Sequence, residues 1–152
     1  MAQPTVFYKR STFVTHLPQE ALYSPSHYWL VAEGGGVWRV GFTKFATRML
    51  GELVDHQFEK QAGAALQSGE IVGSVEGFKA ISDLYSPLQG TFLEGNPLLS
   101  KDPELIGRDP YGEGWLFRAR GEPDSRCGDV AVYRLLLDAT IDRMLEKEGA
   151  SE

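Results

Sequence analysis

The sequence has few of the residues that build metal sites, disulfides or nucleic-acid interfaces. Cys127 is the only cysteine among 152 residues, which excludes an intrachain disulfide and a cysteine-based metal cage. The three histidines, His16, His27 and His56, show no metal-ligand spacing. A net charge of -6 leaves no basic stripe that would displace counterions from a phosphate backbone. We therefore expect neither a zinc or iron site nor a nucleic-acid partner.

Long apolar runs are missing as well. No stretch reaches the roughly 18 apolar residues of a membrane-spanning helix. The N-terminal segment "MAQPTVFYKRSTFVTH" lacks the apolar core of a signal peptide. A single cysteine fits a reducing compartment. These absences predict a cytoplasmic protein without a membrane partner.

The chain is long enough for one domain with its own core. Its first 25 residues predict an extended arm on that domain, because Pro18 and Pro25 interrupt regular structure. Short strand-like runs between glycines then predict a small antiparallel sandwich or flattened barrel. They comprise a hairpin around Gly34–Gly36, segments 53–58, 71–76, 81–85 and 90–93, and the strand "WLFRAR".

Helices are expected at three places. Thr43 and Gly51 have the residue types that begin and end a short helix. Asn96 and Pro97 suit the start of a second, with Asn as the cap and Pro at the first helical position. A stripe of apolar residues at helical spacing predicts a C-terminal helix from about Val130 to Lys147.

The candidate site lies in one predicted hairpin, "SVEGFKAISDLYSP", residues 74–87. Runs of alternating residues flank Gly77, Phe78, Lys79 and Ala80, which we interpret as the turn. Ile71, Gly73 and Val75 are expected on one face of the incoming strand. A lysine at a hairpin tip is accessible to a modifying enzyme, although an ordinary solvated lysine has the same geometry.

The residues around Lys79 carry a resemblance to a known family. "EGFKAISDLYSPLQG" resembles the lipoyl-attachment hairpin of the glycine cleavage H-protein family. The matching positions are Glu76, Lys79, Ala80, Ser82, Asp83, Tyr85, Ser86, Pro87 and Gly90. "VGFTKFATRMLGEL", "NPLLSKDPELIGRDPYGEGWLFRAR" and "LLLDATIDRML" are similar to further segments of the family. The resemblance divides the chain into an arm, 1–25, a lipoyl-carrier domain, 26–147, and a tail, 148–152.

The resemblance implies a mostly β fold with flanking helices. This is a lipoyl-domain-like hybrid barrel-sandwich of two small antiparallel sheets plus the C-terminal helix. Lys79 would carry lipoate in amide linkage, on an arm that shuttles an aminomethyl intermediate of glycine decarboxylation. The chain would then be a carrier protein and not an enzyme.

The same resemblance implies partners and recognition residues. The partners would be a pyridoxal-phosphate glycine decarboxylase, an aminomethyltransferase, dihydrolipoamide dehydrogenase, and a lipoate ligase or transferase. Glu76, Gly77, Phe78, Ala80 and Asp83 would be the residues that the ligase or the partners recognise.

Gly77 and Phe78 depart from the family pattern, which has Ser-Val before the lysine. Phe78 presents apolar surface that can pack on the arm or touch a partner, and Gly77 can relieve a tight turn. Two alternatives therefore stay open. One is a lipoate-binding relative serving another pathway, such as heterodisulfide-reductase-like sulfur oxidation. The other is an unmodified binding protein on the same fold.

Two further functions are disfavoured. Biotin carriers usually have Met-Lys-Met at the tip, whereas this chain has Phe78-Lys79-Ala80. Cys127 lies in a polar loop without an adjacent histidine or a cluster of bases, so the pattern argues against a catalytic thiol.

Overall fold

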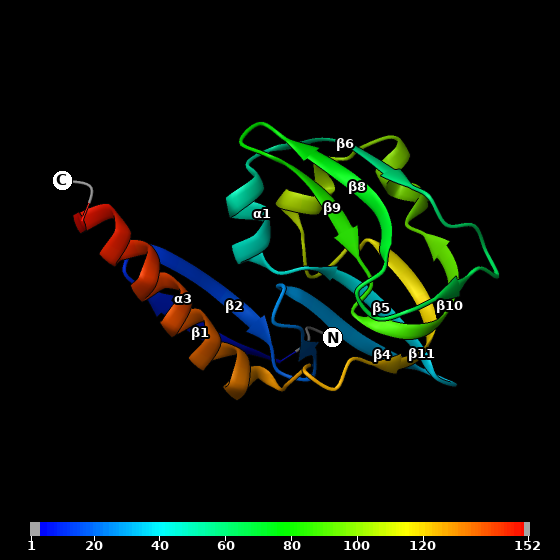
Figure 1. The fold of residues 1–152 in the computed structure, drawn as a ribbon, viewed down its shortest axis with the longest axis horizontal. Coiled ribbons are helices and arrows are strands. Elements are labelled where there is room, and N and C mark those ends of the chain that lie inside the picture. The colour runs from blue at the N-terminus through cyan, green and yellow to red at the C-terminus, as the bar shows by residue number, and fades with distance from the viewer. Residues whose placement is uncertain (1–3, 151–152) are drawn as a thin grey trace.

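The computed structural model describes residues 4–150, which contain three antiparallel sheets (Figure 1). A six-stranded sheet has the order β3-β4-β5-β11-β10-β7, and a three-stranded sheet has the order β6-β8-β9. The bounds of the first are β3 Leu22–Tyr23, β4 Tyr28–Gly34, β5 Val37–Phe42, β7 Ala65–Leu66, β10 Leu88–Gly95 and β11 Phe117–Pro123. Those of the second are β6 Leu53–Phe58, β8 Ile71–Gly77 and β9 Ile81–Tyr85.

The main core takes its side chains from both of these sheets. Leu30 and Phe117 come from the six-stranded sheet, and Val75 and Leu84 from the three-stranded one, and all four are buried in one cluster. Burying a side chain of this size stabilises a fold by about 2 kcal/mol. Together with the flanking helices, these two sheets confirm the predicted lipoyl-domain-like fold.

Most local predictions are confirmed by backbone geometry. Gly34, Gly35 and Gly36 join β4 to β5 with positive φ angles, which favour glycine. α1 spans Lys44–Leu50, the Thr43 hydroxyl accepts a hydrogen bond from the Ala46 N–H, and Gly51 ends the helix at φ 78°. Because these signals depend only on neighbouring residues, the sequence was sufficient to place them.

The segment predicted as a helix beginning at Asn96 contains two separate short helices. Asn96 caps a 3₁₀ helix over Pro97–Ser100 by accepting a hydrogen bond from the Leu98 N–H at 3.0 Å. A separate short helix, α2, follows at Leu105–Arg108. The break falls near Pro103, which lacks a backbone N–H. The sequence therefore predicted the helix start but not α2.

The predicted extended N-terminal arm is wrong. β1 Thr5–Arg10 and β2 Phe13–Pro18 pair as an antiparallel hairpin that forms a sheet of its own. Pro18 is the last residue of β2, so it ends the strand without interrupting it. The runs of β-branched and aromatic residues at 5–8 and 12–15 were the sequence signal that could have revealed this hairpin.

The hairpin packs against α3, which spans Val130–Ala150 and runs alongside β1 and β2 (Figure 1). The Tyr8 hydroxyl donates to Asp138 at 2.7 Å, and Arg10 makes two hydrogen bonds to the Asp142 carboxylate, at 2.6 and 3.0 Å. Phe13 and Ile141 belong to a second buried cluster. No helix in the described part of the chain is long and apolar enough to cross a membrane.

Candidate functional site: the Lys79 hairpin

The turn between β8 and β9 has the predicted position. Glu76 is paired with Ile81, and the Gly77 N–H donates to the Ala80 carbonyl at 2.9 Å, which closes the hairpin over Phe78 and Lys79. Phe78 is 75% exposed, which is unusual for a phenylalanine. The predicted tip, with an accessible lysine beside an exposed aromatic ring, is confirmed.

The outer face of the hairpin is both acidic and apolar. Ser74 pairs with Asp83, and Glu76 with Ile81, so the two carboxylates lie on the same exposed face. Ile81 is 74% exposed there. Val75 and Leu84 form the inner, buried face. This outer face therefore presents negative charge and apolar surface next to Lys79.

The predicted assignment of residues to the two faces of β8 is wrong at the start of the strand. Ile71 was expected on the same face as Gly73 and Val75, but a register shift between Ile71 and Gly73 interrupts the alternation of β8. Val72 is buried and Ile71 is exposed as a result. A bulge of this kind inserts an extra residue on one strand, and the sequence pattern does not reveal it.

Backbone contacts hold the tip against the end of α1. The Lys79 N–H donates to the Leu50 carbonyl at 2.9 Å, and the Phe78 N–H to the Glu52 carbonyl at 3.0 Å. A β-carbon at Gly77 would lie 2.2 Å from the Leu50 oxygen. Gly77 is therefore explained by the close approach of α1, and not by the relief of a tight turn that the sequence suggested.

The side chain of Lys79 lies across the C-terminal end of α1. A β-carbon at Gly51 would come within 2.9 Å of Lys79 Cγ, and Lys79 Nζ donates to the Arg48 carbonyl at 3.4 Å. Carbonyls in the last turn of a helix lack partners within the helix and accept such donors. The amine is exposed, but it rests on the protein surface.

A cleft of about 600 Å³ opens beside Lys79, between α1 and α2. It is lined by four cationic side chains, Lys44, Arg48, Lys79 and Arg108, and by two carboxylates, Glu52 and Glu104. A hydrogen bond with Glu52, together with its negative charge, raises the pKa of Glu104. Sequence reasoning missed this cleft because α2 approaches α1 only in the folded chain.

A smaller groove of about 230 Å³ lies on another side of α1, next to β9. Phe42 and Met49 give it apolar walls, and Ser82 and Asp83 give it a polar side. Tyr28 also lines it, and its hydroxyl accepts a hydrogen bond from the Tyr85 N–H at 2.9 Å. Asp83 therefore takes part in both the outer hairpin face and this groove.

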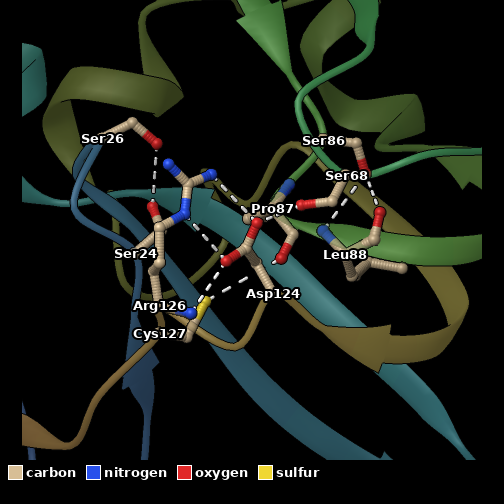
Figure 2. A network of polar contacts seen from close by, with 9 residues as sticks. All are labelled: Ser24, Ser26, Ser68, Ser86, Pro87, Leu88, Asp124, Arg126 and Cys127. Atoms are coloured by element: carbon tan, nitrogen blue, oxygen red, sulfur yellow. Dashed lines mark hydrogen bonds and ion pairs between the residues drawn. The ribbon is translucent and has the colours of Figure 1, made fainter.

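The base of the hairpin is fixed by a polar network (Figure 2). The buried Ser86 hydroxyl donates to the Leu88 carbonyl at 2.6 Å, and Asp124 pairs with Arg126 at 3.0 Å. The Cys127 thiol points to the Pro87 carbonyl at 3.8 Å. Burial, with the negative charge of Asp124, raises the pKa of Cys127 to about 11, so the thiol stays protonated at neutral pH.

His27 has a structural position. Its Nδ1 lies 2.8 Å from the Tyr133 hydroxyl, and burial lowers its pKa to about 4. Within residues 4–150, no group of three or more potential metal ligands comes together.

Comparison with known proteins identifies the family. Residues 21–132 match the family model described as glycine cleavage H-protein. The chain belongs to the glycine cleavage H-protein family. The match includes the whole Lys79 hairpin, and it leaves out β1, β2 and most of α3. The predicted family is confirmed, and with it the carrier role in glycine cleavage.

Relatives and a solved structure agree with this assignment. The glycine cleavage system H protein of Rubrobacter xylanophilus is 42% identical over 124 residues, covering 80% of this chain and 97% of its own. That of Sodalis glossinidius is 36% identical over 128 residues, covering 82% and 97%. The crystal structure of the H protein from Mycobacterium marinum aligns with a TM-score of 0.70 at 34% identity, covering 77% of this chain and 95% of that one.

Proposed function

We propose that Lys79 carries lipoate in amide linkage and that the chain presents this arm to the enzymes of glycine cleavage. The observation that supports the proposal most directly is the position of Lys79. Lys79 is exposed at the tip of the β8–β9 hairpin, and its backbone N–H donates to the Leu50 carbonyl at 2.9 Å. A fixed backbone and an accessible amine suit a ligase that must reach one lysine among several.

The residues present fit an acylated lysine. Lys79 Nζ makes one hydrogen bond, at 3.4 Å, to the Arg48 carbonyl, and an amide N–H can still donate to that oxygen. Acylation removes one positive charge from the cleft, where Lys44 and Arg108 keep theirs. Lipoate supplies a dithiolane that opens on reduction and closes on oxidation. The chain supplies the attachment point, the fixed tip and the surface beside it.

We infer that the outer hairpin face is the surface that other proteins recognise. Glu76 and Asp83 place two negative charges on it, and Phe78 adds exposed apolar area. The Gly77 N–H donates to the Ala80 carbonyl at 2.9 Å and closes the turn beside this face. The proteins that would use this face are a lipoate ligase or transferase, a pyridoxal-phosphate glycine decarboxylase, an aminomethyltransferase and dihydrolipoamide dehydrogenase. We also propose that the carrier domain spans residues 26–147. We propose in addition that the protein is cytoplasmic.

The experiment is intact-mass measurement of protein from its native host, followed by peptide mapping around Lys79. One added lipoyl group on Lys79 is the expected result. Lys79→Arg should abolish the mass increase, and Lys101→Arg, at another exposed lysine, should leave it unchanged. An unmodified Lys79 would overturn the proposal and favour an unmodified binding protein.

The pathway is tested separately with lipoylated protein. Glycine–bicarbonate exchange with competent partner enzymes is expected. Gly77 and Phe78 are the departures that favour the second candidate, a lipoyl carrier for sulfur oxidation. Lipoylated protein that fails in the exchange assay would move the assignment to that candidate.

A further inference from the structure

An apolar pocket of about 330 Å³ lies where the β1–β2 turn, α1 and α3 meet. We call it the hairpin–α3 pocket. Among the residues that line it, Phe13, Phe45 and Ile141 are buried, whereas Met49 and Leu145 are 48% and 44% exposed. The pocket therefore has a buried apolar floor and an accessible apolar rim.

Contacts between the three elements hold this pocket in shape. The rings of Phe13 and Phe45 meet edge to face with centroids 5.6 Å apart, which joins the hairpin to α1. Arg10 makes two hydrogen bonds to the Asp142 carboxylate, at 3.0 and 2.6 Å, which join the hairpin to α3. The volume is at the lower end of the range of small-molecule sites. A small apolar group would therefore enter a space that already exists.

One cation in the lining has no acidic partner. The Arg48 guanidinium lies 5.8 Å from the centroid of the Phe13 ring. Arg48 takes part in none of the ion pairs within residues 4–150. Glu148 also lines the pocket, but it belongs to α3, whereas Arg48 belongs to α1. A carboxylate that enters on the α1 side would therefore gain a charge-assisted hydrogen bond.

The β1–β2 turn adds neutral hydrogen-bond donors. Ser11 and Thr12 line the pocket, and both are exposed. Hydroxyl groups can donate to a carboxylate oxygen. Because these polar residues are exposed and the apolar floor is buried, the pocket fits a molecule with one anionic end and one apolar end.

We propose that the hairpin–α3 pocket binds a small free carboxylic acid with an apolar body, of which a medium-chain alkanoate is the simplest. Its chain would lie on the apolar floor, and its carboxylate would pair with Arg48. Phe13 and Ile141 lie outside residues 21–132, so the pocket depends on segments that flank the part matching the family. The ligand is a separate molecule, so this inference goes beyond the proposed function and does not require modification of Lys79.

A methionine methyl signal reports binding in the pocket. Met144 lines the hairpin–α3 pocket, whereas Met49 lines both this pocket and the groove beside β9, so Met144 is the decisive reporter. The protein is Lys79→Arg, which carries no acylated lysine at the tip, with ¹³C-labelled methionine methyl groups. Titration with decanoate at neutral pH, below its micelle concentration, should shift the Met144 signal with saturation. The absence of a saturable shift would overturn the inference.

A series of chain lengths tests the apolar floor. Each CH₂ that leaves water should lower Kd about fourfold from hexanoate to decanoate. The same Kd for all members of the series would overturn the inference, because the chain would then remain in solvent.

Decylamine tests the role of charge, because it has the same chain with a cationic end. It should bind about tenfold more weakly than decanoate. Arg48→Gln should weaken decanoate binding about tenfold. Arg143→Gln is the control, because Arg143 is exposed on α3 and is not among the pocket residues. Equal binding of the two ligands, or unchanged decanoate binding in Arg48→Gln, would overturn the inference.

Two substitutions on α3 test the location. Leu145 lines the pocket, whereas Leu135 is 70% exposed and is not among the pocket residues. Leu145→Glu places a negative charge at the rim and should abolish the Met144 response to decanoate. Leu135→Glu should bind decanoate like the starting protein. A Met144 shift that persists in Leu145→Glu would show that decanoate binds elsewhere and would overturn the inference.

Discussion

Gly77 lies so close to Leu50 that a β-carbon at position 77 would be 2.2 Å from the Leu50 carbonyl oxygen. The same oxygen accepts the Lys79 N–H at 2.9 Å. One carbonyl therefore holds the lysine in place and excludes a side chain two residues earlier. The serine that the family pattern has at this position would require the tip and α1 to move apart.

Gly77→Ala should lower the free energy of unfolding by about 1–3 kcal/mol, the usual cost of overpacking, and should slow lipoylation of Lys79. Urea unfolding and the rate of mass increase with a lipoate ligase measure the two effects. Gly149→Ala is the control, because a β-carbon at Gly149 would have nothing within 4 Å. Equal unfolding midpoints for Gly77→Ala and the unchanged protein would contradict the close contact.

Phe78→Ala should leave the free energy of unfolding within about 0.5 kcal/mol of the starting value, because the ring is mostly exposed. If the ring is part of the recognised surface, kcat/KM for lipoylation or for a partner enzyme should fall about tenfold. Phe7→Ala, at the exposed Phe7 of β1, is the control. Unchanged kinetics with every partner would exclude Phe78 from recognition.

His27 should make the protein less stable in mild acid. Its pKa is lowered from 6.5 to about 4, because burial disfavours the charged ring. Below pH 6.5 the unfolded chain binds a proton that the folded chain does not, so stability falls as the pH drops towards 4. The loss is on the order of 3 kcal/mol.

The measurement is urea unfolding at pH 7.5 and 4.5 for the unchanged protein and His27→Asn. Asparagine is chosen because residue 27 has φ 73°, which Asn tolerates better than most residues. The stability advantage of the unchanged protein over the variant should shrink at the lower pH. An advantage that stays constant would show that folding does not lower the pKa of His27.

Tyr8→Phe should loosen the β1–β2 hairpin from α3. The Tyr8 hydroxyl donates to the Asp138 carboxylate at 2.7 Å, and loss of such a bond costs about 1–3 kcal/mol. Hydrogen exchange of the β1 and β2 amides should become faster, while exchange in β8 and β9 should not change. Tyr85→Phe, at an exposed tyrosine of β9, is the control. Uniformly faster exchange throughout the chain would contradict a local role for this bond.

The sequence by itself determined the features that depend on neighbouring residues. Alternation along β8 and β9 placed the turn at Lys79, and the cap residues Thr43 and Gly51 placed α1. The motif around Lys79 was also sufficient to indicate the family. Each of these signals lies within a few residues of the element it specifies, so no knowledge of distant contacts was needed.

Only the tertiary structure decided what surrounds Lys79. Gly77 is explained by Leu50, which lies 27 residues earlier in the sequence, and the cleft requires α2 to approach α1. Phe13 and Ile141, which are far apart in the sequence, line one pocket. Such contacts depend on how elements pack, and residue periodicity carries no record of which distant surface will cover a given face. The proposed attachment residue was therefore visible in the sequence, whereas its surroundings came from the fold.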